Sequence, residues 1–145
     1  FHITLSFLGT IDEMTRMRLI EKASNVHQTF LEQFSQLQIK QLSTKSVERF
    51  NKPKVAYISF QSTPQWLHTL ANNLIKLAKE EDIYQEVREY CPHISIYRKA
   101  EILPTSIPAF SAQLMKPMIM SSFSLYESVS TQNGVKYTPL KRWML

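Results

Sequence analysis

The sequence predicts an α+β domain built on antiparallel sheet, and three observations lead to that prediction. Segments that alternate apolar and polar residues and are rich in strand-forming residues recur along the chain. Two amphipathic helical patterns separate them, without the regular strand–helix alternation that indicates a parallel sheet. Asn133-Gly134, a dipeptide typical of tight hairpins, stands between two apolar arms near the carboxyl end. With 145 residues, the chain is long enough for one compact domain, and we expect a single domain over residues 1–145.

The first predicted elements are a strand and a long helix. Phe1–Leu8 alternates and is rich in β-formers, which predicts a strand. Thr10 fits the N-cap of a helix, with Glu13 three residues later completing a capping box. An apolar stripe extends this helix to about Phe34. A strand this central rarely opens a domain, so we expect an N-terminal strand and helix to be absent from this chain.

Two further strands and a second helix are predicted in the middle of the chain. Leu37–Leu42 and Val55–Phe60 alternate as strands do. The basic stretch 45–54 between them fits a solvated connector at least as well as a loop that steers phosphate. Thr63-Pro64 reads as an N-cap followed by proline at the first helical position, and the apolar stripe continues to about Glu81.

The last third of the chain is predicted to contain a short strand, a loop and a hairpin. His93–Tyr97 follows a proline and alternates as a strand. Residues 100–117 contain three prolines and are predicted to have little regular structure. Met118–Ser128 and Val135–Leu140 are the predicted arms of the hairpin.

Composition excludes several classes of protein. Only two glycines occur, too few for a Walker loop or a dinucleotide-binding turn. A single cysteine, Cys91, excludes a disulfide framework and a multi-cysteine zinc site, so we expect a reducing compartment, the cytoplasm. No apolar run approaches the roughly 18–20 residues of a membrane span, and no basic-then-apolar leader is present. The net charge of +5 favours an anionic partner such as RNA, although many proteins are mildly basic.

Two short segments share the pattern His-x-Thr/Ser-aliphatic: His2-Ile3-Thr4-Leu5 and His93-Ile94-Ser95-Ile96. Because strand side chains alternate between faces, the histidine and the hydroxyl of each segment point one way and the aliphatic residues the other. Each strand thus offers an imidazole and a hydroxyl about 7 Å apart along one face. If the two faces converge, two imidazoles and two hydroxyls surround one cavity.

Such a set of side chains suits the cleavage of a phosphodiester. The reaction needs a base to deprotonate the nucleophile and an acid to protonate the leaving alkoxide, and histidine performs either role near neutral pH. Hydroxyls donate hydrogen bonds to the non-bridging oxygens as charge develops. The alternative is a metal site built from His2 and His93, which needs a third ligand that the sequence does not indicate.

The motifs and their surroundings resemble the 2H phosphoesterase superfamily, which is defined by two His-x-Thr/Ser motifs. His2–Gly9 (HITLSFLG) is similar to the first motif and its following Phe-Leu-Gly, and Pro92–Arg98 (PHISIYR) to the second. The tail Tyr137–Leu145 (YTPLKRWML) is similar to the end of the bacterial RNA 2′,3′-cyclic phosphodiesterases of this superfamily. The resemblance implies a bilobal LigT-like fold, with two antiparallel sheets related by pseudo-two-fold symmetry around a central cleft and helices outside.

The resemblance also implies roles for five residues. His2 is expected to donate a proton to the leaving 3′-oxygen, and His93 to accept one from water, although the sequence itself leaves acid and base interchangeable. Thr4 and Ser95 are expected to bind the phosphate oxygens. Arg98 is a further expected phosphate or RNA contact, although strand alternation places it opposite His93, so we expect it beyond the regular strand.

The function implied is metal-independent hydrolysis of an RNA 2′,3′-cyclic phosphate to the 2′-phosphate, without a cofactor. The same groups could also join tRNA halves through 2′-5′ linkages, and the sequence does not separate the two reactions. A catalytically silent nucleotide- or RNA-binding module is the alternative, because some relatives bind nucleotides without known turnover. We expect a monomer whose partners are nucleotides, tRNA halves and RNAs with cyclic phosphate ends.

Overall fold

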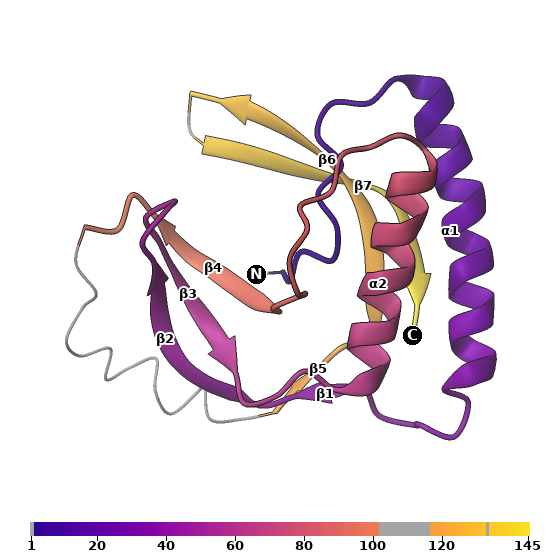
Figure 1. The fold of residues 1–145 in the computed structure, drawn as a ribbon, viewed down its shortest axis with the longest axis horizontal. Coiled ribbons are helices and arrows are strands. Elements are labelled where there is room, and N and C mark those ends of the chain that lie inside the picture. The colour runs from indigo at the N-terminus through magenta and orange to yellow at the C-terminus, as the bar shows by residue number, and fades with distance from the viewer. Residues whose placement is uncertain (1, 102–116, 133) are drawn as a thin grey trace.

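The computed structural model describes residues 2–101, 117–132 and 134–145. Helices and antiparallel strands are mixed in this part of the chain, which confirms the α+β class (Figure 1). The elements in chain order are α1 (Glu13–Gln33), β1 (Gln41–Leu42), β2 (Thr44–Phe50), β3 (Val55–Phe60), α2 (Gln65–Glu80), β4 (His93–Arg98), β5 (Met118–Ile119), β6 (Ser122–Thr131) and β7 (Gly134–Met144). No helix in these residues is long and apolar enough to cross a membrane.

The strands of the described residues form three antiparallel sheets. One contains β2, β3 and β4 in that order, and the others are the pairs β1–β5 and β6–β7. In Figure 1 the three-stranded sheet lies on the left, the two helices stand on the right, and the β6–β7 hairpin extends from beside the helices to the upper left. The predicted hairpin is confirmed, with Thr131 opposite Gly134. Its first arm lies nearer the turn than expected, and its second arm is longer than expected. Asn133 lies outside the described residues.

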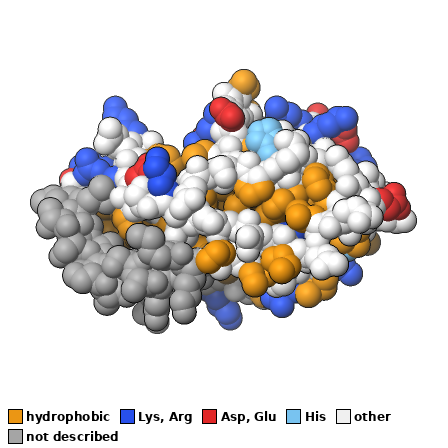
Figure 2. All heavy atoms as spheres, turned by 90° about the horizontal axis from the view of Figure 1, so that it is seen from below, with side chains coloured by type: hydrophobic (Ala, Val, Ile, Leu, Met, Phe, Trp, Pro, Cys, Tyr) orange, Lys and Arg blue, Asp and Glu red, His pale blue; other side chains and the backbone are white. Residues whose placement is uncertain are grey.

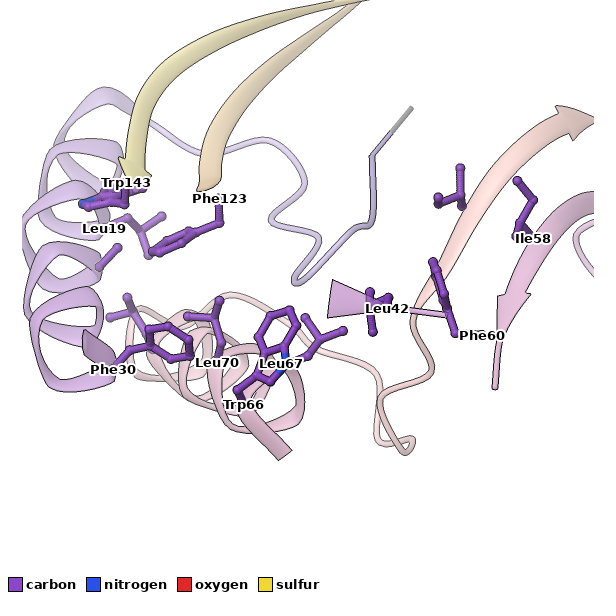
Figure 3. Packing of buried hydrophobic residues seen from close by; sticks show 13 residues of the cluster. Leu19, Phe30, Leu42, Ile58, Phe60, Trp66, Leu67, Leu70, Phe123 and Trp143 are labelled. Carbon is purple, nitrogen blue, oxygen red and sulfur yellow. The ribbon is translucent and has the colours of Figure 1, made fainter. Parts of the chain in front are cut away.

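The core connects the helices to both large sheets. Figure 3 shows buried side chains of α1 and α2 next to Phe123 and Trp143 of the hairpin, and a second group beside the three-stranded sheet. The Trp143 indole donates a hydrogen bond to Ser24 Oγ of α1 at 3.0 Å. The fully buried side chains of greatest volume are Phe30, Leu42, Leu70 and Ile94. Packing of helices on sheets therefore places the strands that line the site described below.

Hydrophobic side chains are also exposed on the face seen from below in Figure 2. The short β1–β5 pair lies along the lower edge of Figure 1. Ile39, just before β1, is 57% exposed, and Ile119 of β5 is 67% exposed. These side chains add little to the core, because burial from water is what makes apolar side chains stabilising.

The prediction of a strand over Phe1–Leu8 is wrong, because residues 2–8 pair with no strand of the described residues. The capping box was also misplaced. The N-cap of α1 is Asp12, whose carboxylate accepts a hydrogen bond from the Thr15 backbone N–H at 2.7 Å. Asp12 replaces Thr10 in this role because the helix begins at Glu13, and only the residue before the first turn can cap its free N–H groups.

The second helix and the first short strands also differ from expectation. Pro64, rather than Thr63, is the N-cap of α2 and makes no side-chain capping bond. The predicted strand 37–42 is reduced to β1. The basic stretch 45–54, expected to be a connector or a loop that steers phosphate, instead contributes its first six residues to β2, Thr44–Phe50. This strand lies at the edge of its sheet and carries the charged residues Lys45, Glu48 and Arg49, so no apolar alternation marks it. Of the predicted loop 100–117, residues 102–116 lie outside the described residues.

Candidate active site

All five residues that the sequence analysis singled out line one cleft of about 730 Å³. His2 and Thr4 come from the segment before α1, and His93, Ser95 and Arg98 from β4. Figure 1 shows the amino-terminal end of the chain between β4 and α2. Apolar side chains of both helices and of the β6–β7 hairpin form other parts of the wall, among them Leu19, Leu67, Leu70 and Phe123.

The segment that carries His2 keeps the predicted alternation although it is not a strand. The side chains of His2 and Thr4 are exposed. Ile3 and Leu5 between and after them are half-buried and pack against the core. Packing of the two apolar side chains against the core therefore orients the segment, and the imidazole and the hydroxyl lie on the side of the cleft.

The loop between α2 and β4 holds this segment through hydrogen bonds that the sequence analysis did not predict. Ser6 Oγ donates to Gln85 Oε1 at 3.0 Å, and Gln85 Nε2 donates to the Phe7 carbonyl at 2.8 Å. The Tyr90 hydroxyl donates to the Thr4 carbonyl at 3.3 Å. Burial raises the pKa of Tyr90, so this hydroxyl stays protonated at neutral pH. No signal in the sequence indicates these bonds, because they join residues about 80 positions apart.

Replacing Tyr90 by phenylalanine is expected to loosen the first motif. The ring stays, and the hydrogen bond to the Thr4 carbonyl is lost, which typically costs about 0.5–1.5 kcal/mol. Amide hydrogen exchange of the peptide containing residues 2–9 should become faster, while exchange in α1 and α2 stays as in the parent. Tyr84→Phe is the matched control, because Tyr84 is 82% exposed. Equal exchange in the Tyr90 variant and the parent would show that this bond does not hold the segment.

The surroundings of His93 fix the tautomer of its ring. Nδ1 lies 3.0 Å from the Cys91 carbonyl oxygen. A carbonyl only accepts hydrogen bonds, so Nδ1 carries the proton and Nε2 of the neutral ring keeps its lone pair. The ring packs edge-on against Phe50 and Tyr57, with centroid distances of 5.1 and 5.5 Å. A histidine held in this way is ready to accept a proton at Nε2.

His2 lies against the β6–β7 hairpin. Its ring stacks on Tyr126, with centroids 6.4 Å apart, and meets the edge of Tyr137 at 5.1 Å. Burial lowers the pKa of His2, and the positive charge of Arg98 lowers it further. Neither tyrosine was identified from the sequence, because contact with His2 depends on how the hairpin curves over the cleft.

A bulge in β4 corrects the expected position of Arg98. Ser95 lies opposite Tyr57 and Tyr97 opposite Ala56, which leaves Ile96 as an extra residue on β4. The extra residue reverses the alternation beyond it, so Arg98 returns to the face that carries His93 and Ser95. Arg98 is therefore inside the strand and lines the cleft, and the expectation that it lies past the regular strand was wrong.

The described residues contain no group of three or more His, Cys, Asp or Glu side chains placed to hold a metal ion. The two histidines instead have separate partners, a backbone carbonyl for His93 and two tyrosine rings for His2. The residues that line this one cleft can supply an acid, a base and three hydrogen-bond donors to phosphate oxygens.

Two curated proteins are similar to the whole chain. The RNA 2′,3′-cyclic phosphodiesterase of Escherichia coli K12 is 28% identical over 145 residues, which cover 99% of this chain and 75% of that protein. The protein of the same name from Methanocaldococcus jannaschii is 28% identical over 153 residues, covering 98% and 79% respectively. No protein-family model matches the chain.

Solved structures share the fold. A crystal structure described as a phosphoesterase superposes with a TM-score of 0.80 at 26% identity, covering 99% of this chain and 76% of that one. Escherichia coli LigT complexed with 3′-AMP superposes with a TM-score of 0.76 at 25% identity, covering 99% and 76%. The similarity thus includes both motif segments, the helices and the hairpin.

Proposed function

The chain belongs to the 2H phosphoesterase family, and from that premise we propose that it hydrolyses the 2′,3′-cyclic phosphodiester at the end of an RNA. The observation that carries the proposal is that both His-x-hydroxyl motifs line one cleft. The names of the similar proteins support the reaction. Residues 1–145 act in this proposal as one 2H phosphoesterase domain.

In the proposed mechanism, one histidine takes a proton from the attacking water and the other gives a proton to the leaving oxygen. Water attacks phosphorus while its proton passes to Nε2 of His93, the nitrogen that the Cys91 carbonyl leaves unprotonated. The bond between phosphorus and the 3′-oxygen breaks, and His2 donates a proton to that oxygen. The products are a 2′-phosphomonoester and a free 3′-hydroxyl, and no step in this scheme requires a metal ion.

Three donors stabilise the charge on the non-bridging oxygens. The hydroxyls of Thr4 and Ser95 are exposed in the cleft, one beside each histidine. The guanidinium of Arg98, brought to the same face by the bulge, adds a positive charge and a planar pair of donors. Such groups accelerate the reaction because they are already oriented where charge develops.

Arg98→Gln is expected to shift the pH dependence of kcat/KM. The Arg98 charge lowers the pKa of His2, so removing that charge raises this pKa. His2 acts as the acid and must be protonated, so the falling limb of the profile should move to higher pH, on top of a general loss from weaker phosphate binding. Arg16→Gln on α1 is the control for loss of a surface charge. An unmoved limb, or one displaced to lower pH, would contradict the assignment of His2 as acid.

The direct test is hydrolysis of a short RNA ending in a 2′,3′-cyclic phosphate, with EDTA present. We expect the 2′-phosphomonoester as the product and no loss of rate on chelation. His68 lies on α2 and is hydrogen-bonded to Asn72, so His68→Ala should leave the rate unchanged. Formation of the 3′-phosphate, or loss of activity with EDTA, would overturn the mechanism. Binding without turnover would favour the silent nucleotide-binding module.

The ligands we propose are RNA ends with cyclic phosphates, nucleotides and tRNA halves. The structure of LigT with 3′-AMP supports binding of a ribonucleotide by this fold. Ligation of tRNA halves through a 2′-5′ bond uses the same two proton transfers, with a 5′-hydroxyl in place of water: His93 accepts the proton of that hydroxyl, and His2 donates one to the leaving 3′-oxygen. Supplying the assay with an RNA bearing a free 5′-hydroxyl therefore tests ligation with the same protein.

A further inference from the structure

A polar network on the three-stranded sheet has no part in the mechanism above. Glu48 of β2 pairs with Tyr57 of β3, and Ser59 of β3 pairs with His93 of β4. Residues two apart along a strand share a face, so Tyr57 and Ser59 lie on the same face as His93. The network therefore lies next to the proposed base.

An ionised carboxylate stands at the centre of this network. Glu48 accepts hydrogen bonds from Ser59 Oγ at 2.6 Å, from Ser46 Oγ at 2.8 Å and from the Tyr57 hydroxyl at 3.0 Å. The serine bonds, with a further contribution from Tyr57, lower the pKa of Glu48. Burial, and after it the bond to Glu48, raises the pKa of Tyr57 to about 12. At neutral pH the donor and the acceptor of the Tyr57–Glu48 bond are therefore both in the right protonation state.

The rings of Phe50 and Tyr57 form the wall against which His93 rests. They stack with centroids 4.0 Å apart and planes 16° apart. The plane of His93 stands at 82° to Phe50 and 70° to Tyr57. Together with the bond from Nδ1 to the Cys91 carbonyl, this wall restricts rotation of the imidazole.

We propose that Glu48 and Tyr57 are positioning residues that hold His93 in the orientation its reaction requires. Glu48 anchors the Tyr57 hydroxyl, and the anchored ring holds the imidazole so that its Nδ1–H bond persists and Nε2 stays directed at the substrate. Neither residue touches the reacting atoms in this arrangement. The inference rests on the proposed function in naming His93 as the base, and the contacts themselves are independent of it.

The first test removes the hydrogen bond between Tyr57 and Glu48, once at the donor and once at the acceptor. Tyr57→Phe keeps the ring and loses the hydroxyl, and Glu48→Ala loses the acceptor. We expect each to lower kcat about tenfold with KM nearly unchanged, less than the roughly 100-fold that a 1 Å misplacement can cost. Glu48→Gln keeps an acceptor oxygen and should recover most of the rate. Because both residues act through one bond, the double variant should be no slower than the slower single variant.

Matched controls separate this effect from surface changes. Tyr84→Phe and Glu127→Ala remove the same groups from exposed positions and should leave kcat unchanged. Single-variant rates within about twofold of the parent, or losses that multiply in the double variant, would overturn the proposal.

The second test reads the imidazole directly and does not depend on activity. In ¹⁵N spectra of the histidine rings, with His93 assigned by its absence in His93→Ala, the parent should show the tautomer protonated at Nδ1. Tyr57→Phe and Glu48→Ala should shift the signals toward a mixture of tautomers, and an unchanged spectrum would overturn the proposal. If the parent shows no hydrolysis, the proposed function fails, and these spectra still decide whether the two residues position His93.

Discussion

Replacing His93 by alanine is expected to lower kcat for the cyclic phosphate by about 10²–10⁴-fold, the range that a general base contributes. The bond from Nδ1 to the Cys91 carbonyl leaves Nε2 as the proton acceptor, and alanine offers no replacement. His2→Ala should cause a loss of the same order, because the 3′-oxygen would leave without its proton. Hydrolysis of the RNA under saturating substrate, followed by separation of the products, measures both effects.

The two variants also predict how the losses combine. Acid and base act in one transition state, so the double variant should be only slightly slower than the worse single variant. His93 contacts Phe50 and Tyr57, so His93→Gln, which keeps a polar side chain, is needed beside alanine to show that lost chemistry and not lost packing causes the effect. Substantial turnover in a folded His93→Gln protein would exclude His93 as the base.

The direction in which the motif side chains point could be predicted because it is set locally. In both motifs the order His-aliphatic-hydroxyl-aliphatic decides which side chains face the core. Ile3 and Leu5 are half-buried while His2 and Thr4 are exposed, even though residues 2–8 form no sheet. Alternation therefore predicted direction correctly where the strand prediction itself failed. The fold class followed in the same way from helix periodicity and from the hairpin at Gly134.

The features that could not be predicted depend on how strands pair. One extra residue, Ile96, moves Arg98 to the other face of β4. Nothing in this sequence indicates that a bulge occurs there. Strand β2 carries charged side chains at a sheet edge, where apolar alternation is not required. The bond between Glu48 and Tyr57 requires the register of β2 against β3, which is set by the whole sheet.

The core on which the cleft is built gives the largest expected effect on stability. Phe30→Ala is expected to lower the free energy of unfolding by about 3–5 kcal/mol, the cost of a large cavity in a packed core. Phe30 is 1% exposed, and its ring lies 5.0 Å from that of Phe34. Lys40 is only 8% exposed, and its ammonium stands 5.9 Å from the centre of the Phe30 ring, a contact that the substitution removes.

Urea unfolding followed by circular dichroism measures this loss, and Phe7→Ala is the matched control. Phe7 is 75% exposed, so the same substitution there should change the free energy of unfolding by no more than about 0.5 kcal/mol. Equal effects at the two positions would show that Phe30 is not packed as described. Because small domains are stable by only about 5–15 kcal/mol, the Phe30 variant should also lose hydrolytic activity at a lower temperature than the parent. Its kcat at low temperature should be retained, since Phe30 is not among the residues that line the cleft.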